Sequence, residues 1–480
     1  MKNFKLKLTS LIGQSLLLGR TFFKGHCFAA ATFILLLLGG CEKGFLETKP
    51  NKALLIPQTL TDFQRLLDNT YIMNVVPSLP LVAVDEHYTD QNTLNAWLTP
   101  AERNSYTWAA DIFEGQISLD WNYSYKQIFY SNVVLEGLET LEDNLRESDE
   151  ARALKGSALF FRAHALYNLA QIYCQPYQKS GNELLMGLPL KSRADINERV
   201  VRSTLSETYQ QIINDFKTAI PLLPASVASK NRPSKSAAMG MLARVYQTMQ
   251  NYPEALRYAN EVLTLSASLL DFNTLSATLT STANPFPVGL PNANPEVVFF
   301  ATLLGYSYFT NNLRVDSTIY QSYAVNDLRK SVFFVSRANG QINIKGTHAG
   351  TSGGFTGVAN DELLLIRAES YARAGNTASA MADLNQLLIK RFKTGTYVNR
   401  VAGSPEEALE IILTERRKEL FRRCLRWADL RRLNQDPLTA KVLQHNIGGK
   451  TYTLEPGSLR YTYPIPPDEI IASGIAQNPR

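Results

Sequence analysis

Five side chains in this 480-residue sequence could hold a ligand without reacting with it. Asp85 and Tyr88 lie in the segment VAVDEHYTD, Trp97 lies in the polar stretch DQNTLNAWLTP, and Tyr306 and Tyr308 lie in GYSYF. Flat aromatic rings stack on the apolar faces of sugars or against peptide side chains, and a carboxylate orients polar groups. We therefore take these five residues as candidate ligand contacts, with burial in the core as the alternative for each.

No constellation of residues predicts catalysis or a metal site. The five histidines stand at positions 26, 87, 164, 348 and 445, and none belongs to an HExxH motif or a paired ligand spacing. The glycines of positions 346–357 lack the lysine of a phosphate-binding loop. Adjacent acids such as Asp85 and Glu86 point apart, so their adjacency is no evidence for glycosidase chemistry. We expect no catalytic residue, no metal and no cofactor.

The thiol of Cys41 is a candidate for covalent lipid attachment. An almost wholly apolar run, Cys27 to Leu38, is too short to span a membrane and has the length of a signal-peptide core. It ends at Leu38-Gly39-Gly40-Cys41, an order that resembles a bacterial lipobox, in which the cysteine is acylated and becomes the first residue after cleavage. We therefore predict a lipoprotein signal over 1–40, with an ordinary secretory signal as the alternative.

Cleavage before Cys41 would also change the charge. The whole chain has 49 basic and 43 acidic residues. The five basic residues of the signal are Lys2, Lys5, Lys7, Arg20 and Lys24, and no acidic residue precedes Cys41. The mature chain would be close to neutral, so the basic balance is no argument for nucleic acid as a partner.

Helical periodicity dominates the sequence that would position these residues. Apolar residues recur at three- and four-residue steps in 118–141 and 151–173, and in 206–224, where Ser206 is a plausible N-cap. Trp121 lies on one such face and Trp108 precedes it, and we expect both in the core.

One helix pair is repeated at an offset of 125 residues. ARVYQTMQNYPEALRYANEVL, from Ala243, aligns with AESYARAGNTASAMADLNQLL, from Ala368. Each copy predicts helix, tight turn and helix, with Pro253 in a first turn, Gly375 as a left-handed cap and Thr377 as an N-cap. Small residues at set positions let antiparallel helices approach closely, so the pattern is tetratricopeptide-like.

The two copies are separated by a segment of different character. Positions 267–360 are rich in Ser, Thr, Asn, Gly and Pro, and contain short β-type runs such as Val297 to Leu303. We predict a tether over 41–57, an N-terminal helical part over 58–266, a loop-rich mixed insert over 267–360 and a C-terminal part over 361–480. The predicted fold is mostly α, a tetratricopeptide-like scaffold that carries the insert, and long loops on such scaffolds often bind ligands.

The run ERRKELFRRCLRWADLRRL, Glu415 to Leu433, contains eight basic residues and three acids. Apolar residues give it a buried face, and its arginines can pair with Glu415, Glu419 and Asp429. We interpret it as a structural ion-pair helix in preference to a nucleic-acid helix.

The sequence leaves two alternatives for Cys174 and Cys424. They form a disulfide with each other, or they are two unpaired, packed thiols.

Six segments, in order, resemble the SusD/RagB family of outer-membrane nutrient-uptake lipoproteins. They are DWNYSYKQIFYSNVVLE, NPEVVFF, NDLRK, LIRAESYARAGNTASAMADLNQLLIKRF, ILTERRKELFRRCLRWADLRRLN and YPIPPDEIIASGIAQNP. One departure stands out, because the family commonly has an acidic residue after ELF, where this chain has Arg422 and Arg423. These motifs belong to the scaffold, and in this family the ligand-binding residues vary with the substrate.

The resemblance implies a SusD-like fold and a function. The protein would sit on the outer face of the outer membrane, anchored by lipid, and bind glycan or peptide fragments. It would deliver them to a TonB-dependent SusC-like barrel. The alternatives are a surface-anchored glycoside hydrolase and a structural lid of the transporter that binds no small ligand.

Overall fold

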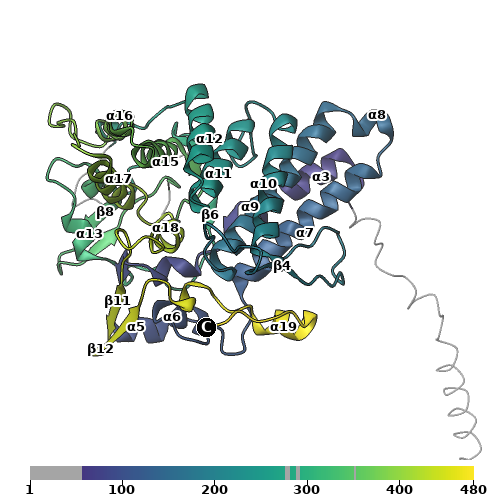
Figure 1. Cartoon of the computed structure of the whole chain (residues 1–480), viewed down its shortest axis with the longest axis horizontal. Coiled ribbons are helices and arrows are strands. Elements are labelled where there is room, and N and C mark those ends of the chain that lie inside the picture. Colours follow the sequence, from purple (N-terminus) through teal and green to yellow (C-terminus); the bar gives the residue numbers. More distant parts are fainter. Residues whose placement is uncertain (1–56, 276–281, 288–291, 351–352) are drawn as a thin grey trace, which may run out of the picture. The chain divides into compact units, whose positions relative to one another are not determined.

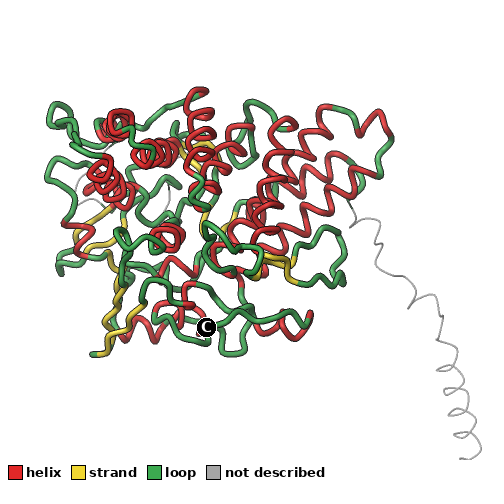
Figure 2. The backbone as a smooth tube through the Cα atoms, in the orientation of Figure 1, coloured by secondary structure: helices red, strands yellow, loops and turns green. Residues whose placement is uncertain are grey.

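A computed structural model describes residues 57–275, 282–287, 292–350 and 353–480. The predicted signal and the predicted tether up to residue 56, including Cys41, lie outside the described residues. Residues 58–480 form one compact unit, and most of its regular structure is helical (Figures 1 and 2), which confirms the predicted fold class. The predicted boundaries at 266 and 360 within this unit stay predictions.

Eight long helices pack as a series in which each contacts the next. They are α7 (Leu119–Glu139), α9 (Asp149–Tyr173), α10 (Leu205–Leu222), α11 (Lys235–Thr248), α12 (Tyr252–Leu265), α15 (Asn360–Arg373), α16 (Thr377–Leu388) and α17 (Pro405–Glu419). The short α8 (Asp143–Arg146) and the hairpin of β3 (Met186–Pro189) and β4 (Arg202–Thr204) fill connections between them. The series gives the unit a continuous helical wall.

The two repeat copies are the helix pairs α11/α12 and α15/α16. Helix α12 packs against α15, so the series runs on across the insert although the insert separates the copies in sequence. Gly375 has φ +80° and Pro253 lies in the first turn of α12, as predicted. Small residues on the facing sides, including Ala243, Ala255 and Ala368, are fully buried, which permits the close helix approach.

Two predicted N-caps are wrong by one or two residues. Thr204, not Ser206, caps α10, because it forms a reciprocal capping box with Glu207. Asn376, not Thr377, caps α16 by accepting a hydrogen bond from the Ser379 backbone. In both cases a residue just upstream has the better geometry, which periodicity alone does not reveal.

The chain between residues 58 and 106 runs along the helical wall in short elements. They are α3 (Leu60–Leu67), α4 (Thr70–Met73), β1 (Val75–Val76), η2 (Leu79–Ala83), β2 (His87–Tyr88), α5 (Gln91–Ala96) and α6 (Pro100–Tyr106). The insert is tied to this segment by strand pairs, because β1 pairs in parallel with β6 (Thr302–Leu303) and β2 pairs with β7 (Arg314–Val315).

The remaining described elements of the insert are also short, as the sequence predicts. They are η3 (Phe272–Thr274), β5 (Val297–Phe299), α13 (Ser317–Gln321), α14 (Arg329–Phe333), β8 (Phe334–Ser336), β9 (Ile342–Ile344) and β10 (Val358–Ala359). Strand β10 pairs with β5 and β8 pairs with β9. The insert therefore has little helix of its own and depends on the scaffold for its shape.

The basic run does not form one helix, which corrects the prediction. It ends α17 at Glu419 and begins α18 (Arg426–Leu433), with a turn between them in which Arg422 and Cys424 have φ near +60°. The chain then forms the hairpin of β11 (Leu443–Ile447) and β12 (Lys450–Leu454), η4 (Leu459–Tyr461) and α19 (Pro467–Ser473). The predicted ion pairing does occur, for example between Arg416 and Asp429.

The core contains both tryptophans that the sequence predicts there. Trp108 and Trp121 are buried, and their indole nitrogens donate to the Ala83 carbonyl and to Glu469, respectively. Cys174 and Cys424 are both free thiols, so the structure supports the unpaired alternative. Cys174 closes α9 in the core, where burial raises its pKa to about 11.

Candidate ligand-binding site

Three of the five candidate residues come together in one aromatic cluster. The ring of Trp97 lies 5.7 Å from that of Tyr106 and 5.8 Å from that of Tyr308, and the Tyr306 ring stacks on Tyr308 at 5.5 Å. Trp97 closes α5, whereas the two tyrosines follow β6 in the insert. The cluster therefore joins the N-terminal segment to the insert.

The hydroxyl groups of Tyr306 and Tyr308 make hydrogen bonds that join separate parts of the fold. The Tyr308 hydroxyl donates to the Ser78 carbonyl at 2.7 Å, and the Tyr306 hydroxyl donates to Asp120 at 3.1 Å. Asp120 also accepts from the backbones of Ser78 and Leu79. Burial raises the pKa of Asp120 to about 6 despite these three donors. This carboxyl group of α7 thus fastens both the N-terminal segment and the insert.

Burial distinguishes the members of this cluster. Tyr308 is fully buried and Trp97 is 3% exposed, so neither has a ring face open to solvent in this structure. Tyr306 is half-buried. Tyr88, on β2, is 39% exposed and lies outside the cluster, with the Arg314 guanidinium 5.7 Å from its ring centroid. Ligand contact by these residues stays a prediction, for which Tyr88 and Tyr306 retain accessible surface.

Asp85 lies in a group of three cations. Its carboxylate binds Arg426 at 2.8 Å, Arg417 at 3.1 Å and Lys441 at 2.6 Å. Burial opposes ionisation, but the three cations outweigh it and hold the pKa of Asp85 well below its usual range. Asp85 therefore joins the N-terminal segment to α17, α18 and the residues before β11.

We expect the variant Asp85→Asn to lose about 2 to 3 kcal/mol of unfolding free energy at pH 7, because three cations lose their common partner. Since the pKa is lowered in the folded state, this stabilisation is present above the unfolded pKa near 4 and fades as the pH falls below it. Urea denaturation at pH 7 and pH 3 measures both effects.

Asp90→Asn is the matched control. Asp90 forms one ion pair, with Arg314, and its side chain is 44% exposed. Asparagine also caps a helix as well as aspartate does, so this variant is expected to lose less than about 1 kcal/mol. An equal loss in the two variants would contradict the role given to Asp85.

A cleft of about 600 Å³ opens beside the aromatic cluster. One part of its lining is Phe309, Thr310 and Asn311, which directly follow Tyr308, and another is Ile344 of β9. The Arg422 side chain lies against the Phe309 ring, with 5.1 Å between the guanidinium carbon and the ring centroid. The rest of the lining is Leu303, Gly305, Gly353 and Gly354. The cleft is therefore built by the insert and by the turn between α17 and α18.

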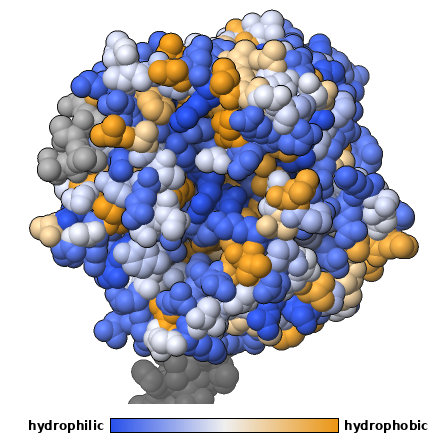
Figure 3. All heavy atoms as spheres, turned by 60° about the vertical axis from the view of Figure 1, so that its left-hand side comes forward, coloured by the Kyte–Doolittle hydropathy of each residue, from blue (hydrophilic) through white to orange (hydrophobic). Residues whose placement is uncertain are grey.

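The surface on the left-hand side of Figure 1 is mixed in character. Figure 3 turns the left-hand side of Figure 1 forward and shows hydrophilic residues gathered in a hollow near the centre of the face, with hydrophobic residues scattered around it. No continuous apolar patch dominates this view. Such a surface suits a polar ligand better than an apolar one.

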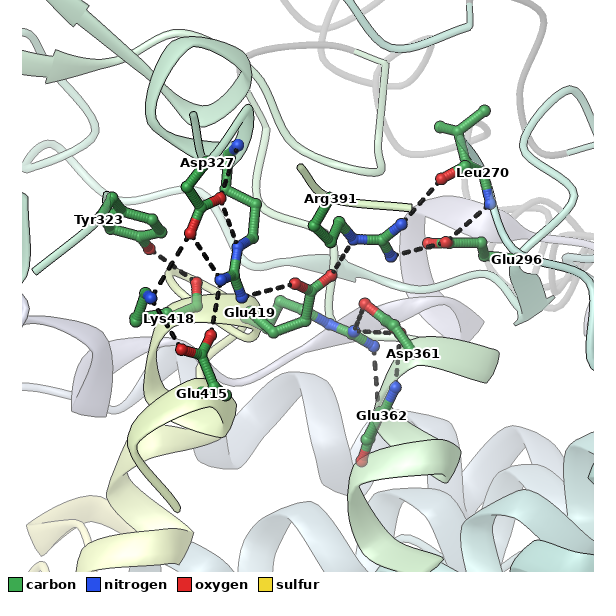
Figure 4. Close-up of polar contacts among 12 residues, drawn as sticks. Leu270, Glu296, Tyr323, Asp327, Asp361, Glu362, Arg391, Glu415, Lys418 and Glu419 are labelled. Carbon is green, nitrogen blue, oxygen red and sulfur yellow. Dashed lines mark hydrogen bonds and ion pairs between the residues drawn. The ribbon is translucent and has the colours of Figure 1, made fainter. Parts of the chain in front are cut away.

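A buried ion network supports the turn that carries Arg422 (Figure 4). Glu419, the last residue of α17, binds Arg391 at 2.7 Å and Arg329 at 3.1 Å. Arg329 also binds Asp327 at 2.7 Å and Glu415 at 2.6 Å. Burial opposes the charge of Glu415, yet Arg329 and Lys418 lower its pKa to about 2. The network thus fixes the insert to the C-terminal end of α17.

A second part of the network reaches the start of α15. Arg391 binds Glu296 at 2.6 Å and donates to the Leu270 carbonyl at 2.7 Å, both in the insert. Arg423 binds Asp361 at 2.9 Å and Glu362 at 3.2 Å. The arginine that follows Arg422 in sequence therefore binds two carboxylates of the scaffold.

Glu296, His348 and Asp361 come together although their spacing in sequence predicts no metal site. Their ligand atoms lie within 4.8 Å of one another, and His348 is 2.9 Å from Glu296 and 3.3 Å from Asp361. Burial disfavours the charged imidazole, but the two carboxylates outweigh it and raise the pKa of His348. Arg391 and Arg423 bind the same carboxylates, so guanidinium groups already supply the positive charge that a metal ion would bring.

None of the five candidate residues lines this cleft, and Arg422 is the charged lining residue that the sequence analysis did not take as a candidate. The signal was present, because Arg422 and Arg423 stand where an acidic residue was expected. Arg422 lines the cleft whereas Arg423 binds carboxylates, because the helix breaks between α17 and α18. Periodicity does not predict this break.

Two family models match the chain. One, described as starch-binding and associating with the outer membrane, matches residues 44–247. The other, described as the SusD family, matches residues 361–480. The SusD-like protein P2 of Formosa agariphila is 23% identical over 387 residues, which cover 69% of this chain and 74% of that protein.

Solved structures share the fold. A putative sugar-binding protein of Bacteroides vulgatus has a TM-score of 0.69 and 21% identity, and the match covers 88% of this chain and 99% of that one. A SusD superfamily protein of Bacteroides thetaiotaomicron has a TM-score of 0.67 and 22% identity, with 88% and 100% covered. At this identity the likeness concerns the fold alone, and it confirms the predicted architecture.

Proposed function

Because the chain belongs to the SusD/RagB family, we propose that it is a cell-surface lipoprotein that binds nutrient oligomers, glycan or peptide, and delivers them to a TonB-dependent SusC-like barrel. The single observation that carries the binding role is the cleft between the insert and the turn after α17. Its volume of about 600 Å³ lies within the range of small-molecule sites.

The cleft favours capture over cleavage. Glycoside hydrolysis uses two carboxyl groups that face each other across the scissile bond. Among the described residues that line the cleft, none is Asp or Glu. The surface-anchored glycoside hydrolase therefore remains only as the alternative, together with a structural lid that binds no small ligand.

Attachment to the outer membrane would be through lipid at Cys41. The family model that covers residues 44–247 is described as associating with the outer membrane, which supports this location. Within the part of the chain that the structure describes, no helix is long and apolar enough to cross a membrane. The SusC-like partner is proposed from the family resemblance.

One experiment separates the three possibilities. The lipoprotein is extracted in detergent, tested on an array of glycans and peptides, and then incubated with each bound oligosaccharide while new reducing ends are measured. We expect binding without turnover. Sustained release of reducing ends would establish a hydrolase, and an array without hits while a barrel co-purifies would favour the structural lid.

A further inference from the structure

Arg422 differs from Arg423, Arg329 and Arg391 in having no carboxylate partner among the residues that the structure describes. Arg423, Arg329 and Arg391 each bind carboxylates. Arg422 is only 4% exposed, yet its guanidinium makes no hydrogen bond and no ion pair with any residue that the structure describes. A buried charge without a partner is costly, so such groups normally acquire one.

The Glu86 carboxyl group attracts Arg422 electrostatically but makes no hydrogen bond to its guanidinium. Glu86 accepts a hydrogen bond from the Arg422 backbone nitrogen at 3.1 Å, not from the guanidinium. Burial, followed by repulsion from Asp85, raises the pKa of Glu86 to about 7, so at neutral pH this group carries only part of a charge. Burial lowers the pKa of Arg422 to about 10, which still leaves it cationic at neutral pH.

The Arg422 side chain is packed on one face and borders the cleft. It lies over the Phe309 ring, which covers one of its faces, and it forms part of the lining of the cleft. Nε is fully buried and unpaired. A planar guanidinium offers its edge to an oxyanion in a forked arrangement, and the cleft is the space from which an oxyanion can reach it.

The rest of the lining suits a sugar. Thr310 and Asn311 are exposed and supply a hydroxyl and an amide, which can both donate to and accept from sugar hydroxyls. Gly305 has open space where a side chain would stand and leaves room for a ring, whereas Leu303 packs against Gly354. A peptide would gain more from apolar pockets, and among the described residues that line this cleft three have apolar side chains: Leu303, Phe309 and Ile344.

We propose that the cleft binds an oligosaccharide that carries an anionic group, a carboxylate or a sulfate on a sugar ring, and that this group pairs with Arg422. The inference rests on the proposed binding function and narrows its ligand class. An acidic peptide is the competing ligand and becomes an outcome of the test.

The test compares matched probes on the full-length lipoprotein in detergent. An array presents neutral glycans, uronate glycans, sulfated glycans and oligoglutamate peptides, and dissociation constants are then measured for the glycans that bind. Wild type is expected to bind a uronate or sulfated glycan. Arg422→Met should weaken that binding about tenfold or more, because a hydrogen-bonded charge pair is lost. Arg422→Lys should recover part of the loss, and the uronate and sulfate arms identify the source of the anion.

A second pair of variants guards against a folding defect at residue 422. The Thr310 hydroxyl accepts a hydrogen bond from the Asn312 backbone, and Asp or Asn can replace it in that role. Thr310→Asp introduces a negative charge into the cleft and should weaken binding of the acidic glycan severalfold. Thr310→Asn has the same shape without the charge and should leave binding close to wild type.

Each outcome either supports the proposed pairing of an anionic glycan with Arg422 or overturns it. Loss of binding in Arg422→Met and in Thr310→Asp, but not in Thr310→Asn, supports the proposal. Binding of neutral glycans alone overturns it and leaves the proposed function intact. Binding of oligoglutamate alone, or acidic-glycan binding that both charge-changing variants leave unchanged, also overturns it. An array without any glycan hit overturns the glycan-binding role itself, and this inference with it.

Discussion

Replacing Arg329 by methionine is expected to lower the free energy of unfolding by about 3 to 5 kcal/mol, a large share of the stability of an ordinary domain. Arg329 is fully buried and binds three carboxylates, on Asp327, Glu415 and Glu419. Methionine keeps the packing volume roughly but supplies no charge. The variant therefore leaves a group of buried anions with Lys418 as the nearest remaining cation on Asp327 and Glu415. Denaturant unfolding at neutral pH measures the loss.

Arg257→Met is the matched control. Arg257 also binds two carboxylates, Glu254 at 2.8 Å and Glu261 at 2.6 Å, but its side chain is 44% exposed on α12. Exposed ion pairs contribute little, so we expect a loss below about 1 kcal/mol. If Arg329→Met unfolds with the same free energy as this control, the network is not what stabilises the junction.

The same network should be needed for ligand binding. Glu419 ends α17 and binds Arg391 and Arg329, and Arg422 lies three residues further on in the turn. Loss of the network releases the insert from α17, and these two parts build the cleft together. The Arg329 variant is therefore expected to lose binding as well as stability.

The network consists of contacts between distant parts of the chain, which the sequence predicts less well than local helical periodicity. Three of its residues come from short motifs that looked unremarkable separately: Glu296 from NPEVVFF, Asp327 from NDLRK and Glu415 from ILTERRKEL. The structure brings these motifs together across more than a hundred residues. Helical periodicity and the repeat could be read locally, because each depends on neighbours three or four positions away.

The candidate site was harder to predict, because it depends on distant contacts. Tyr308 and Trp97 have the residue types of a sugar-binding surface, but they pack on each other and on Tyr106. Asp85 has three cationic partners, all more than 300 residues away in sequence. Nothing in the local pattern separates an aromatic residue that faces a ligand from one that joins two segments.

Arg422 shows the converse case. Its position next to Arg423 in a basic run favoured an ion-paired helix. The structure breaks that helix and gives residue 422 a left-handed backbone, with φ of +59°. One arginine turns to Asp361 and Glu362 while the other lines the cleft. The departure from the family pattern therefore marks a residue that lines the cleft, whereas ligand contact by the aromatic candidates stays a prediction.

The second large effect concerns the membrane. We expect Cys41→Ala to move the protein from the membrane fraction to the soluble fraction almost completely. Each buried CH₂ contributes about 0.8 kcal/mol, and two or more acyl chains hold a protein firmly on a bilayer. Alanine has no thiol to acylate, so the whole of this energy is lost. Fractionation and detergent phase partitioning measure the change.

Cys27→Ala is the matched control, because Cys27 begins the apolar run and does not follow the Leu-Gly-Gly sequence at its C-terminal end. This variant should remain in the membrane fraction as wild type does. Both variants are best expressed in a Gram-negative host without the partner barrel, since a barrel could retain an unlipidated protein. Under those conditions only the lipid can hold the chain, and a Cys41→Ala protein that stays membrane-bound at the wild-type level would refute the lipobox.

The variants Cys41→Ala and Arg329→Met test membrane attachment and ligand binding separately. The proposed function combines these two properties. Cys41→Ala should remove the anchor and leave ligand binding intact, because every described residue that lines the cleft lies between Leu303 and Arg422, far along the chain from Cys41. Arg329→Met should weaken the folded body and leave acylation intact, because lipid attachment depends on the signal and not on the scaffold. A released Cys41→Ala protein that still binds its glycan would therefore establish that capture and attachment are independent properties of this chain.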